Sequence, residues 1–427
     1  MRRIDLASVS AQDLRRLTRR SAVPAIEVRD AAAAIVEGVR HGGDAAVARY
    51  GARFGGGSGL RVAESDIARA GESLTPALRE AIEAAAANVE TVHRAQLPLD
   101  QRVEPMPGIV VERRWAPLQR VGCYVPGGGA PLPSTLIMTV VPARVAGVPS
   151  IAVATPARDD GTVDPVTLGT AAVLGVTEVL AVGGAQAIAA LAFGTETIDP
   201  VQKIVGPGNR WVTAAKMAVA AEVAIDMPAG PSEALVLADG RADPRLVAAD
   251  LLAQAEHGAD SPVVLVTDDA SLADAVAARV EEMLSTLERS ALIRAALAAE
   301  GLVVVAPDLE AAMAFADGYA PEHLSLHLTD PSGAVERITA AGSVFVGPWA
   351  PEPVGDYATG ANHVLPTGGM AVSMGPLSTE DFGSWRQVQT LTRRGLAAVR
   401  PIVAALASAE GLTAHRAAVE IRFEAEP

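Results

Sequence analysis

The sequence predicts an α/β protein with parallel-sheet cores, and three observations lead to this prediction. Half of the 427 residues are hydrophobic but only 3% are aromatic, so the apolar volume is mostly alanine, valine and leucine, which suits helices packed on sheets. From about residue 119 onward, short apolar runs alternate with segments of helical length. These runs form two successive series, which indicates two related α/β halves with right-handed crossovers.

The first 100 or so residues are predicted to be mainly helical. Residues 28–53 carry apolar side chains at spacings of three and four, and Thr75 and Pro76 occupy the cap and the first position of a further helix. Between the two helices, "GARFGGGSGL" (51–60) predicts a flexible break. After them, "GIVVERRW" (108–115) alternates in polarity and predicts a strand.

The strand candidates fall into two series that are separated by helical connections. The first series is "RVGCYVP", "SIAVATP", "EVLAVGG", "KIVGPGN" and "VAIDMP". The second series is "EALVLAD", "PVVLVTD", "LVVVAPD" and "GSVFVG". The final 50 residues, which contain "RRGLAAVRPIVAALASAEGLTAHRAAVEIRF", return to a helical pattern and are expected to pack on something else.

Charge and composition exclude several classes of function. The chain has 35 lysine and arginine residues against 50 aspartate and glutamate residues, and the net charge of −15 repels the phosphates of a nucleic acid. A single cysteine, Cys123, rules out an intramolecular disulfide framework and a zinc site built from cysteines. The basic N-terminus lacks the apolar core of a signal peptide, and the longest apolar stretches are too short to span a bilayer. We therefore expect a soluble cytoplasmic protein with no nucleic-acid or membrane partner.

Three glycine-rich turns, 125–135, 182–190 and 205–213, follow strand candidates of the first series. In parallel sheets, ligands bind beyond the carboxyl ends of the strands, where loops and helix N-termini converge. Each of these turns allows close backbone approach and opens a helix whose N-terminus favours anions. None matches the dinucleotide fingerprint G-x-G-x-x-G, and each alone is equally compatible with an ordinary strand-to-helix turn. Together they favour a cofactor that carries phosphate.

Polar side chains that can bind a metal occur in several separate segments. Gln254 and His257 stand three residues apart at the end of a predicted helix, in "LLAQAEHGAD", so they project from the same side. His363 follows Asp356 by seven residues in a glycine-rich loop, and His415 lies in the C-terminal helical region. Zinc accepts imidazole and carboxylate ligands, so a site without cysteine can form where these groups converge. A glutamine amide is a weak, neutral ligand and this spacing is common, so the pair alone is a weak metal signal.

The adjacent residues Glu322 and His323, in "YAPEHLSL", are expected in a turn led by proline, where both side chains can face a cleft. A neutral imidazole is the natural general base at pH 7, and a neighbouring carboxylate can polarise a water. The competing interpretation is a turn with a solvated glutamate and histidine. For every histidine the alternative is a hydrogen-bonded core or surface group, and His41, His93 and His327 receive only this interpretation.

Longer motifs along the chain resemble those of a known family. They are "YVPGGGAPLPSTLIM", "VGGAQAIAALAFGTETI", "KIVGPGNRWVT", "IDMPAGPSEALVLAD", "ADLLAQAEHGADSPVVLVT", "YAPEHL", "AGSVFVGPWAPEPVGDYATGANHVLPT" and "EGLTAHRAAVEIR", in that order. The whole set is similar to the motifs of the histidinol dehydrogenase family. The resemblance covers residues 25–425, which is essentially the whole chain.

The resemblance implies an NAD-linked enzyme that contains zinc, one ion per subunit. Members of the family oxidise the amino alcohol L-histidinol to L-histidine through the aldehyde in two NAD-dependent steps of histidine biosynthesis. They are homodimers with shared active sites, and each chain has two incomplete Rossmann-like domains. The implied division of this chain is 1–24 as an N-terminal helical arm, 25–120 with 232–375 as a first α/β domain with the metal and catalytic residues, 121–231 as a second, NAD-binding α/β domain, and 376–427 as a C-terminal helical tail that reaches the partner subunit.

The resemblance also assigns roles to individual residues. It implies that His323 is the general base and that Glu322 is its partner. The implied NAD contacts, which fall in or beside the glycine-rich turns, are Tyr124, Gln186 and Asn209. The implied zinc ligands are Gln254, His257, Asp356 and, from the partner subunit, His415. The implied substrate contacts are Ser232, His363 and Glu410, together with His323 and the four zinc ligands.

Two short segments depart from the family's pattern: 383–386 after "STEDF", and Arg210 with Trp211 beside a glycine-rich turn. They leave the substrate open, because relatives with the same motifs oxidise other alcohols. The alternative function is therefore the same two-step, NAD-dependent oxidation of a different primary alcohol, such as a sulfonated diol. A catalytically silent protein that only binds a small metabolite is a second alternative, and the intact pair of Glu322 and His323 argues against it.

Overall fold

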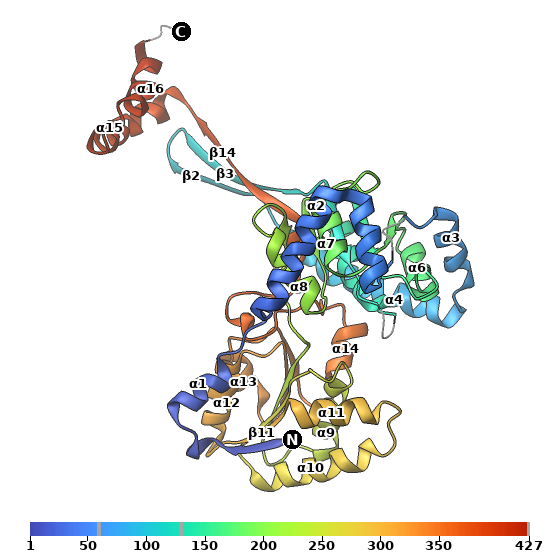
Figure 1. Cartoon of the computed structure of the whole chain (residues 1–427). Helices are drawn as coiled ribbons and strands as arrows, with labels where there is room; N and C mark the ends of the chain where they lie inside the picture. Colours follow the sequence, from blue (N-terminus) through green and yellow to red (C-terminus); the bar gives the residue numbers. More distant parts are fainter. Residues whose placement is uncertain (58–60, 128–130, 425–427) are drawn as a thin grey trace. The chain divides into compact units, whose positions relative to one another are not determined.

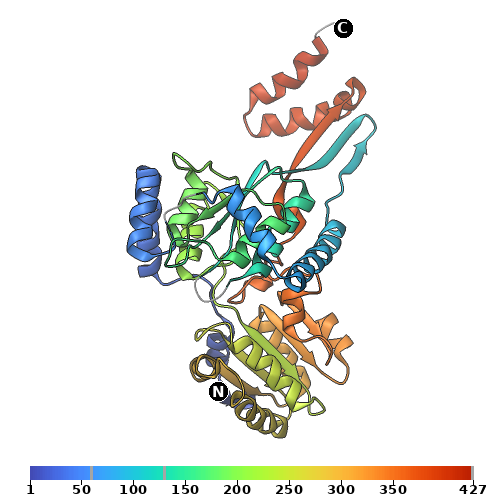
Figure 2. The same cartoon turned by 90° about the vertical axis from the view of Figure 1, so that its right-hand side faces the viewer.

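The computed structural model describes residues 1–57, 61–127 and 131–424. The chain forms two compact units, each of which combines segments that are distant in the sequence (Figures 1 and 2). The first unit contains Met1–Gln96 and Leu118–Phe382, and the second contains Leu97–Pro117 and Gly383–Pro427.

The first unit contains a six-stranded parallel sheet with the strand order β1-β11-β10-β9-β12-β13. Its strands are β1 (Arg2–Asp5), β9 (Ala234–Ala238), β10 (Val263–Thr267), β11 (Gly301–Val305), β12 (His323–His327) and β13 (Ser343–Val346). Successive strand residues point into different cores, since Leu235 and Val264 belong to one core and Val236 and Leu265 to the other. Both faces of this sheet are therefore covered, as parallel sheets require.

Helices on the two faces of this sheet supply the rest of the two cores (Figure 1). One core contains residues of α9 (Pro244–Ala255), α10 (Ala270–Leu284) and α11 (Ser290–Ala299). The other contains residues of α1 (Ala11–Thr18), α12 (Leu309–Tyr319) and α13 (Pro331–Arg337). The short helix α14 (Glu352–Tyr357) follows β13 and packs against α9. The 3-10 turns of this unit are η1 (Leu6–Ser8), η2 (Met370–Val372) and η3 (Thr379–Phe382).

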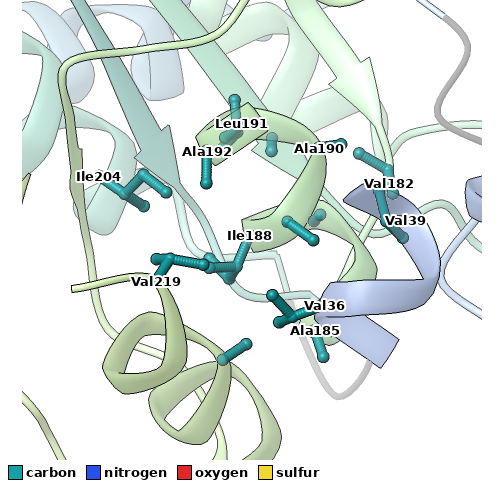
Figure 3. Packing of buried hydrophobic residues seen from close by; sticks show 14 of the residues in the cluster. Val36, Val39, Val182, Ala185, Ile188, Ala190, Leu191, Ala192, Ile204 and Val219 are labelled. Atoms are coloured by element: carbon teal, nitrogen blue, oxygen red, sulfur yellow. The ribbon is translucent and has the colours of Figure 1, made fainter. Parts of the chain in front are cut away.

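The first unit also contains a five-stranded parallel sheet with the order β6-β5-β4-β7-β8. Its strands are β4 (Arg120–Tyr124), β5 (Ser150–Thr155), β6 (Val179–Ala181), β7 (Lys203–Val205) and β8 (Ala224–Ile225). Helices α2 (Ile26–Phe54), α7 (Gly184–Phe193) and α8 (Arg210–Val219) share one core with it, in which Ile188 and Leu191 are fully buried (Figure 3). The remaining helices of this unit are α3 (Glu64–Ser73), α4 (Pro76–Ala95), α5 (Pro133–Ala146) and α6 (Pro165–Val173).

The second unit is built on a three-stranded antiparallel sheet with the order β14-β3-β2. Its strands are β2 (Gln101–Met106), β3 (Ile109–Pro117) and β14 (Gly383–Leu391), and two helices follow, α15 (Arg393–Ala409) and α16 (Thr413–Glu424). The β14–β3 register places Trp385 opposite Trp115, and the Arg113 guanidinium lies 3.9 Å from the centroid of the Trp385 ring. The departure from the family's pattern at 383–386 therefore lies at the start of β14.

The predicted α/β class, with parallel-sheet cores and helical terminal segments, is confirmed. The helix predicted over 28–53 is α2, which bends at Gly43, where φ is 48°. The predicted cap of α4 is present, since Thr75 Oγ1 accepts a hydrogen bond from the Leu78 amide and Pro76 is the first helical residue. The predicted strand at 108–115 is β3. Both strand series appear as β4–β8 and as β9, β10, β11 and β13.

Three strands occur where the sequence predicted other structure. β1 pairs with β11 in the region predicted as a helical arm, and β14 pairs with β3 in the region predicted as a helical tail. β12 begins at His323, in a segment predicted as a turn. In β12 every second residue is polar, which is typical of an exposed segment, yet all five residues are buried because β9 and β13 flank it. Among the described residues, no helix is both long and apolar enough to cross a membrane.

Candidate active site

A cavity of about 860 Å³ in the first unit is lined by loops that belong to both parallel sheets. The predicted site residues that line it are Asn209, Ser232, His257, Glu322, His323, Asp356 and His363. These side chains come from segments up to 154 positions apart (209 to 363). The fold therefore brings together residues that the sequence proposed separately as site residues.

The predicted base lies at the amino end of the six-stranded sheet, and this corrects the expectation that ligands bind at carboxyl ends. His323 is the first residue of β12 and pairs with Ala234, the first residue of β9. At the opposite, carboxyl edge, aspartates are used as helix caps, and these are Asp243, Asp269, Asp308 and Asp330. The expectation holds for the five-stranded sheet, where Asn209 follows β7 and lines the cavity.

His323 has the hydrogen bonding of a neutral general base. Its Nδ1 lies 3.1 Å from the carbonyl oxygen of Glu233, so the proton on Nδ1 is donated to that oxygen. Its Nε2 is then the unprotonated nitrogen, and this atom is buried with no hydrogen-bond partner among the described residues. Burial lowers the pKa of His323 to about 4, so the ring is neutral at pH 7 and Nε2 can accept a proton.

Glu322 is held beside this ring by two hydrogen bonds. Its Oε2 accepts from the Ser232 hydroxyl at 2.9 Å and from the Glu233 amide at 2.8 Å, and it lies 3.6 Å from His323 Nδ1. Burial raises the pKa of Glu322 well above its ordinary value. The predicted substrate contact Ser232 lines the cavity and at the same time fixes the orientation of Glu322.

Three side chains from α14 and the end of α9 form a group that can hold a metal ion. His257 Nε2 is 3.9 Å from Asp356 Oδ2 and 3.8 Å from Glu352 Oε1, and one ligand atom of each residue lies within 4.8 Å of the others. Sequence reasoning predicted His257 and Asp356 but missed Glu352. The signal was its position four residues before Asp356, which places both carboxylates on one side of α14.

The buried polar atoms in this region favour an ionic ligand. Gln254 is fully buried on α9, and neither its amide oxygen nor its amide nitrogen has a hydrogen-bond partner within the described part of the chain. Both carboxylate oxygens of Glu352 likewise accept no hydrogen bond from a described residue. Burial and the neighbouring Asp356 carboxylate raise the pKa of Glu352 to about 8. An unsatisfied buried group costs stability, and a set of imidazole, carboxylate and amide donors fits zinc or a similar divalent cation.

His363 supports the loop that carries Asp356. Its Nδ1 lies 3.1 Å from the Asp356 carbonyl oxygen and 3.5 Å from Asp356 Oδ1, and its Nε2 lies 3.3 Å from the Thr135 hydroxyl. Burial lowers the pKa of His363, so its ring is held in the neutral form. The histidines that the sequence interpreted only as core or surface groups are hydrogen-bonded where they are buried. His93 bonds to the Val89 carbonyl, and His327 bonds to Asp250.

The predicted cofactor contacts lie at the carboxyl edge of the five-stranded sheet. The Tyr124 hydroxyl accepts from the Gly184 amide at 3.1 Å, and Gln186 Nε2 donates to the Gly55 carbonyl at 3.4 Å. Asn209 Oδ1 caps α8 by accepting from the amides of residues 211 and 212, at 3.0 and 3.2 Å. Of these three, Asn209 lines the cavity. Part of the first glycine-rich turn, 128–130, lies outside the described residues.

The turn between β7 and α8 brings two backbones together. Gly206 has a φ of 114°, and a Cβ there would lie 2.1 Å from the Tyr124 carbonyl oxygen, so only glycine fits. Arg210 and Trp211, which depart from the family's pattern, begin α8 and line the cavity.

The two remaining predicted residues belong to the second unit. Glu410 is the exposed C-cap of α15, and His415 is exposed on the first turn of α16. The other predicted site residues all belong to the first unit.

Comparison with known proteins gives one consistent result. The sequence model of the family described as "Histidinol dehydrogenase" matches residues 18–423. A histidinol dehydrogenase from Haloarcula marismortui is 50% identical over 399 residues, 93% of this chain and 94% of that protein, and one from Xanthomonas euvesicatoria is 47% identical over 411 residues, 95% of each. The crystal structure of histidinol dehydrogenase from Elizabethkingia anophelis superposes with a TM-score of 0.93 at 38% identity, over 99% of this chain and 98% of that one. These matches confirm the resemblance found in the sequence, and the chain belongs to the histidinol dehydrogenase family.

Proposed function

We propose that this protein oxidises L-histidinol to L-histidine through the aldehyde, in two NAD-dependent steps of histidine biosynthesis. The observation that carries the proposal is His323 at the cavity, with Nδ1 anchored on a carbonyl and Nε2 unprotonated and unpartnered among the described residues. The relatives named histidinol dehydrogenase, which match over nearly their full length, support the substrate.

The chain's own residues supply the proton transfers. In the first step His323 Nε2 takes the hydroxyl proton of the alcohol while a hydride leaves its carbon, which gives the aldehyde. A water then adds to the aldehyde carbon, and Glu322 helps to deprotonate this water. His323 then releases its first proton to solvent water. In the second step it takes a hydroxyl proton of the hydrate as the second hydride leaves, which gives the carboxylic acid. Contacts in the cavity keep the aldehyde in place between the steps, and such positioning contributes several kcal/mol.

We propose that the hydride acceptor, NAD, binds at the carboxyl edge of the five-stranded sheet, next to Tyr124, Gln186 and Asn209. Each NAD that binds there accepts one hydride. Support comes from the N-termini of α7 and α8, which follow glycine-rich turns and favour phosphate groups. This assignment makes 121–231 the cofactor-binding part of the chain.

We propose that Gln254, His257 and Asp356 hold one zinc ion per subunit, with Glu352 beside them and His415 of the partner subunit as a further ligand. When bound, zinc orients the imidazole and amino groups of the substrate. Ser232, His363 and the partner's Glu410 complete the substrate contacts. On this proposal the enzyme is a homodimer in which each cavity is completed by the other subunit.

The direct test is NADH formation by the purified protein with L-histidinol. We expect two NADH per L-histidinol, and loss of nearly all turnover in His323→Ala but not in His41→Ala, whose ring is exposed. If the protein reduces NAD with a sulfonated diol or another primary alcohol but not with L-histidinol, the alternative substrate is correct. If no alcohol supports NADH formation, the protein only binds its ligand.

The metal site has a test that does not need activity. We expect about one zinc per chain by elemental analysis, and His257→Ala should retain much less. Because a ligand that binds only the folded state stabilises it, zinc added to metal-free protein should raise the melting temperature of the wild type more than that of His257→Ala. Equal zinc content in both proteins would contradict the assignment of His257.

A further inference from the structure

Next to the catalytic pair is another buried carboxylate, Glu233, whose side chain is 3% exposed. It forms an ion pair with the guanidinium of Arg20, which lies in the connection between α1 and α2. Arg20 also stacks on the Tyr319 ring, 3.4 Å from its centroid, and donates to the Tyr319 carbonyl at the end of α12. The family resemblance gives no role to Arg20 or Glu233.

Glu233 and Glu322 hold each other by reciprocal hydrogen bonds. The Glu322 carboxylate accepts from the Glu233 amide at 2.8 Å, and the Glu233 carboxylate accepts from the Glu322 amide at 3.3 Å. The same Glu233 oxygen accepts from the Gly368 amide at 3.1 Å. The segment that leads into β9 is therefore fixed to the segment that leads into β12 through both side chains.

The carbonyl oxygen of Glu233 orients the base. It accepts from the His323 amide at 3.3 Å and lies 3.1 Å from His323 Nδ1. Residue 233 thus contacts Glu322 through its amide and its carboxylate, and His323 through its carbonyl. A change in the backbone at Glu233 would move both groups together.

Arg20 supplies the positive charge that this arrangement needs. Two carboxylates buried close together repel each other unless one is neutral or paired, and a cation favours the charged form of its partner. Burial raises the pKa of Glu233, and Arg20 opposes this shift. Arg20 also anchors the chain immediately before residues 21–24, which line the cavity.

We propose that Arg20 and Glu233 are positioning residues for the reaction: Arg20 holds the Glu233 carboxylate, and Glu233 thereby fixes the orientation of His323 and Glu322. Neither residue contacts the substrate in this assignment. The kinetic consequences rest on the function proposed above, whereas the orientation of the His323 ring can be measured without it.

The first series of variants separates positioning from simple stability. Arg20→Met leaves a buried carboxylate without a cation, so we expect kcat for L-histidinol to fall by about tenfold to a hundredfold, the range typical of a misplaced catalytic group. KM should change much less, because the predicted metal ligands and the substrate contact His363 are not bonded to Arg20 or Glu233. The matched control is Arg120→Met, since the Arg120 side chain is also 16% exposed and pairs with Glu178, whose side chain is 14% exposed, at the five-stranded sheet. Arg120→Met should lower the melting temperature while kcat stays near that of the wild type.

The second series tests the charge pairing itself. In Arg20→Met/Glu233→Gln the amide oxygen of glutamine can still accept from residues 322 and 368, and no unpaired charge remains. Replacing both members of a buried ion pair by neutral groups is much less disruptive than removing one. We expect the double variant to fold even if Arg20→Met does not, and to recover a large part of kcat. A double variant as slow as Arg20→Met, or an equal loss of kcat in Arg120→Met, would overturn the proposal.

A readout without catalysis separates this proposal from the proposed function. The chain has seven histidines, so the ¹⁵N spectrum of histidine-labelled protein is simple, and His323→Ala identifies the His323 signal. In the wild type this signal should report a proton on Nδ1, and in Arg20→Met it should shift toward a mixture of the two tautomers. An unchanged His323 signal in Arg20→Met contradicts positioning. A shifted signal in a protein that does not oxidise L-histidinol leaves positioning intact and refutes the proposed function instead.

Discussion

The only cysteine of the chain, Cys123, is fully buried on β4. Burial raises the pKa of its thiol to about 12, so the reactive thiolate is absent at ordinary pH. We expect the folded protein to be inert toward a thiol reagent such as Ellman's reagent at pH 8, and to react with one equivalent once it is unfolded in urea. Rapid reaction of the folded protein would contradict the burial of this side chain.

The same thiol makes stability depend on alkaline pH. Between pH 9, the ordinary thiol value, and about 12, the folded chain keeps a proton on Cys123 that the unfolded chain has lost. Since the unfolded state then binds fewer protons, the free energy of unfolding falls as pH rises, by about 1.4 kcal/mol per pH unit. Cys123→Ala lacks this proton, so urea unfolding of both proteins at pH 9 to 11 should show a steeper decline for the wild type.

At single positions, the sequence predicted candidate residues for the chemistry but missed the contacts that support them. Gln254 and His257 were identified as a pair because helical spacing is visible in the sequence. Arg20 and Glu233 were not, because their ion pair joins positions 213 apart and exists only after folding. Glu352 was missed because a carboxylate after a proline resembles an ordinary helix start, and only its burial without hydrogen-bond partners among the described residues distinguishes it.

Among the elements, the turn between β7 and α8 depends on a buried ion pair. Lys216 and Asp226 form an ion pair, and their side chains are 2% and 1% exposed. Both also bond to the backbone of Gly206. Lys216 Nζ donates to the Gly206 carbonyl at 3.0 Å, and Asp226 Oδ2 accepts from the Gly206 amide at 2.7 Å. Lys216→Met leaves a buried aspartate unpaired, so we expect it to lower the free energy of unfolding by about 3–5 kcal/mol, as measured in urea.

A pair between a strand of the same sheet and η3, in which one partner is partly exposed, provides the control for Lys216→Met. Lys203 Nζ lies 3.2 Å from Asp381 Oδ1, and the Asp381 side chain is 36% exposed. Water screens such a pair, so Lys203→Met should cost about 1 kcal/mol or less. If both lysine variants lose the same stability, burial does not account for the effect at Lys216.

The start of α4 offers a prediction about a single helix. The Thr75 hydroxyl accepts a hydrogen bond from the Leu78 amide and so satisfies one of the free donors at the helix start. Thr75→Ala should lower the free energy of unfolding by about 1 kcal/mol. The hydroxyl of Thr91, exposed in the middle of the same helix, donates to the Ala87 carbonyl and caps no helix end, so Thr91→Ala should be near neutral in the same measurement.

The elements that the sequence predicted are those whose pattern is complete within the segment. β10 and β11 are continuous apolar runs, and α4 has a cap and a proline at its start. β1, β12 and β14 lack such patterns, because their stability comes from neighbouring strands: β1 carries two arginines and an aspartate and is a strand only beside β11. For the same reason the sequence placed His323 in a turn, although it is the first residue of β12.

For the whole molecule, the predicted site residues are divided between the two units. The first unit holds Gln254, His257, Glu322, His323 and Asp356, and the second holds Glu410 and His415. The family motifs around these residues were identified from the sequence because they are contiguous. No local sequence pattern indicates that the site is shared between two subunits, so this arrangement stays a prediction.

Mixed dimers test this prediction. In a mixed dimer with shared sites both defects fall in the same cavity: the His323→Ala subunit lacks the base there, and the His415→Ala subunit supplies no ligand to it. The other cavity is therefore intact. With random exchange of equal amounts, half of the dimers are mixed, and about a quarter of the wild-type activity should return for a two-fold symmetric dimer. The control is His323→Ala mixed with Asp356→Ala: both residues are in the first unit, so each cavity keeps one defect. His415→Ala alone should also retain less zinc than the wild type. If subunits that demonstrably exchange, for example by differential tagging, give no activity in the first mixture, then each chain forms its site without its partner.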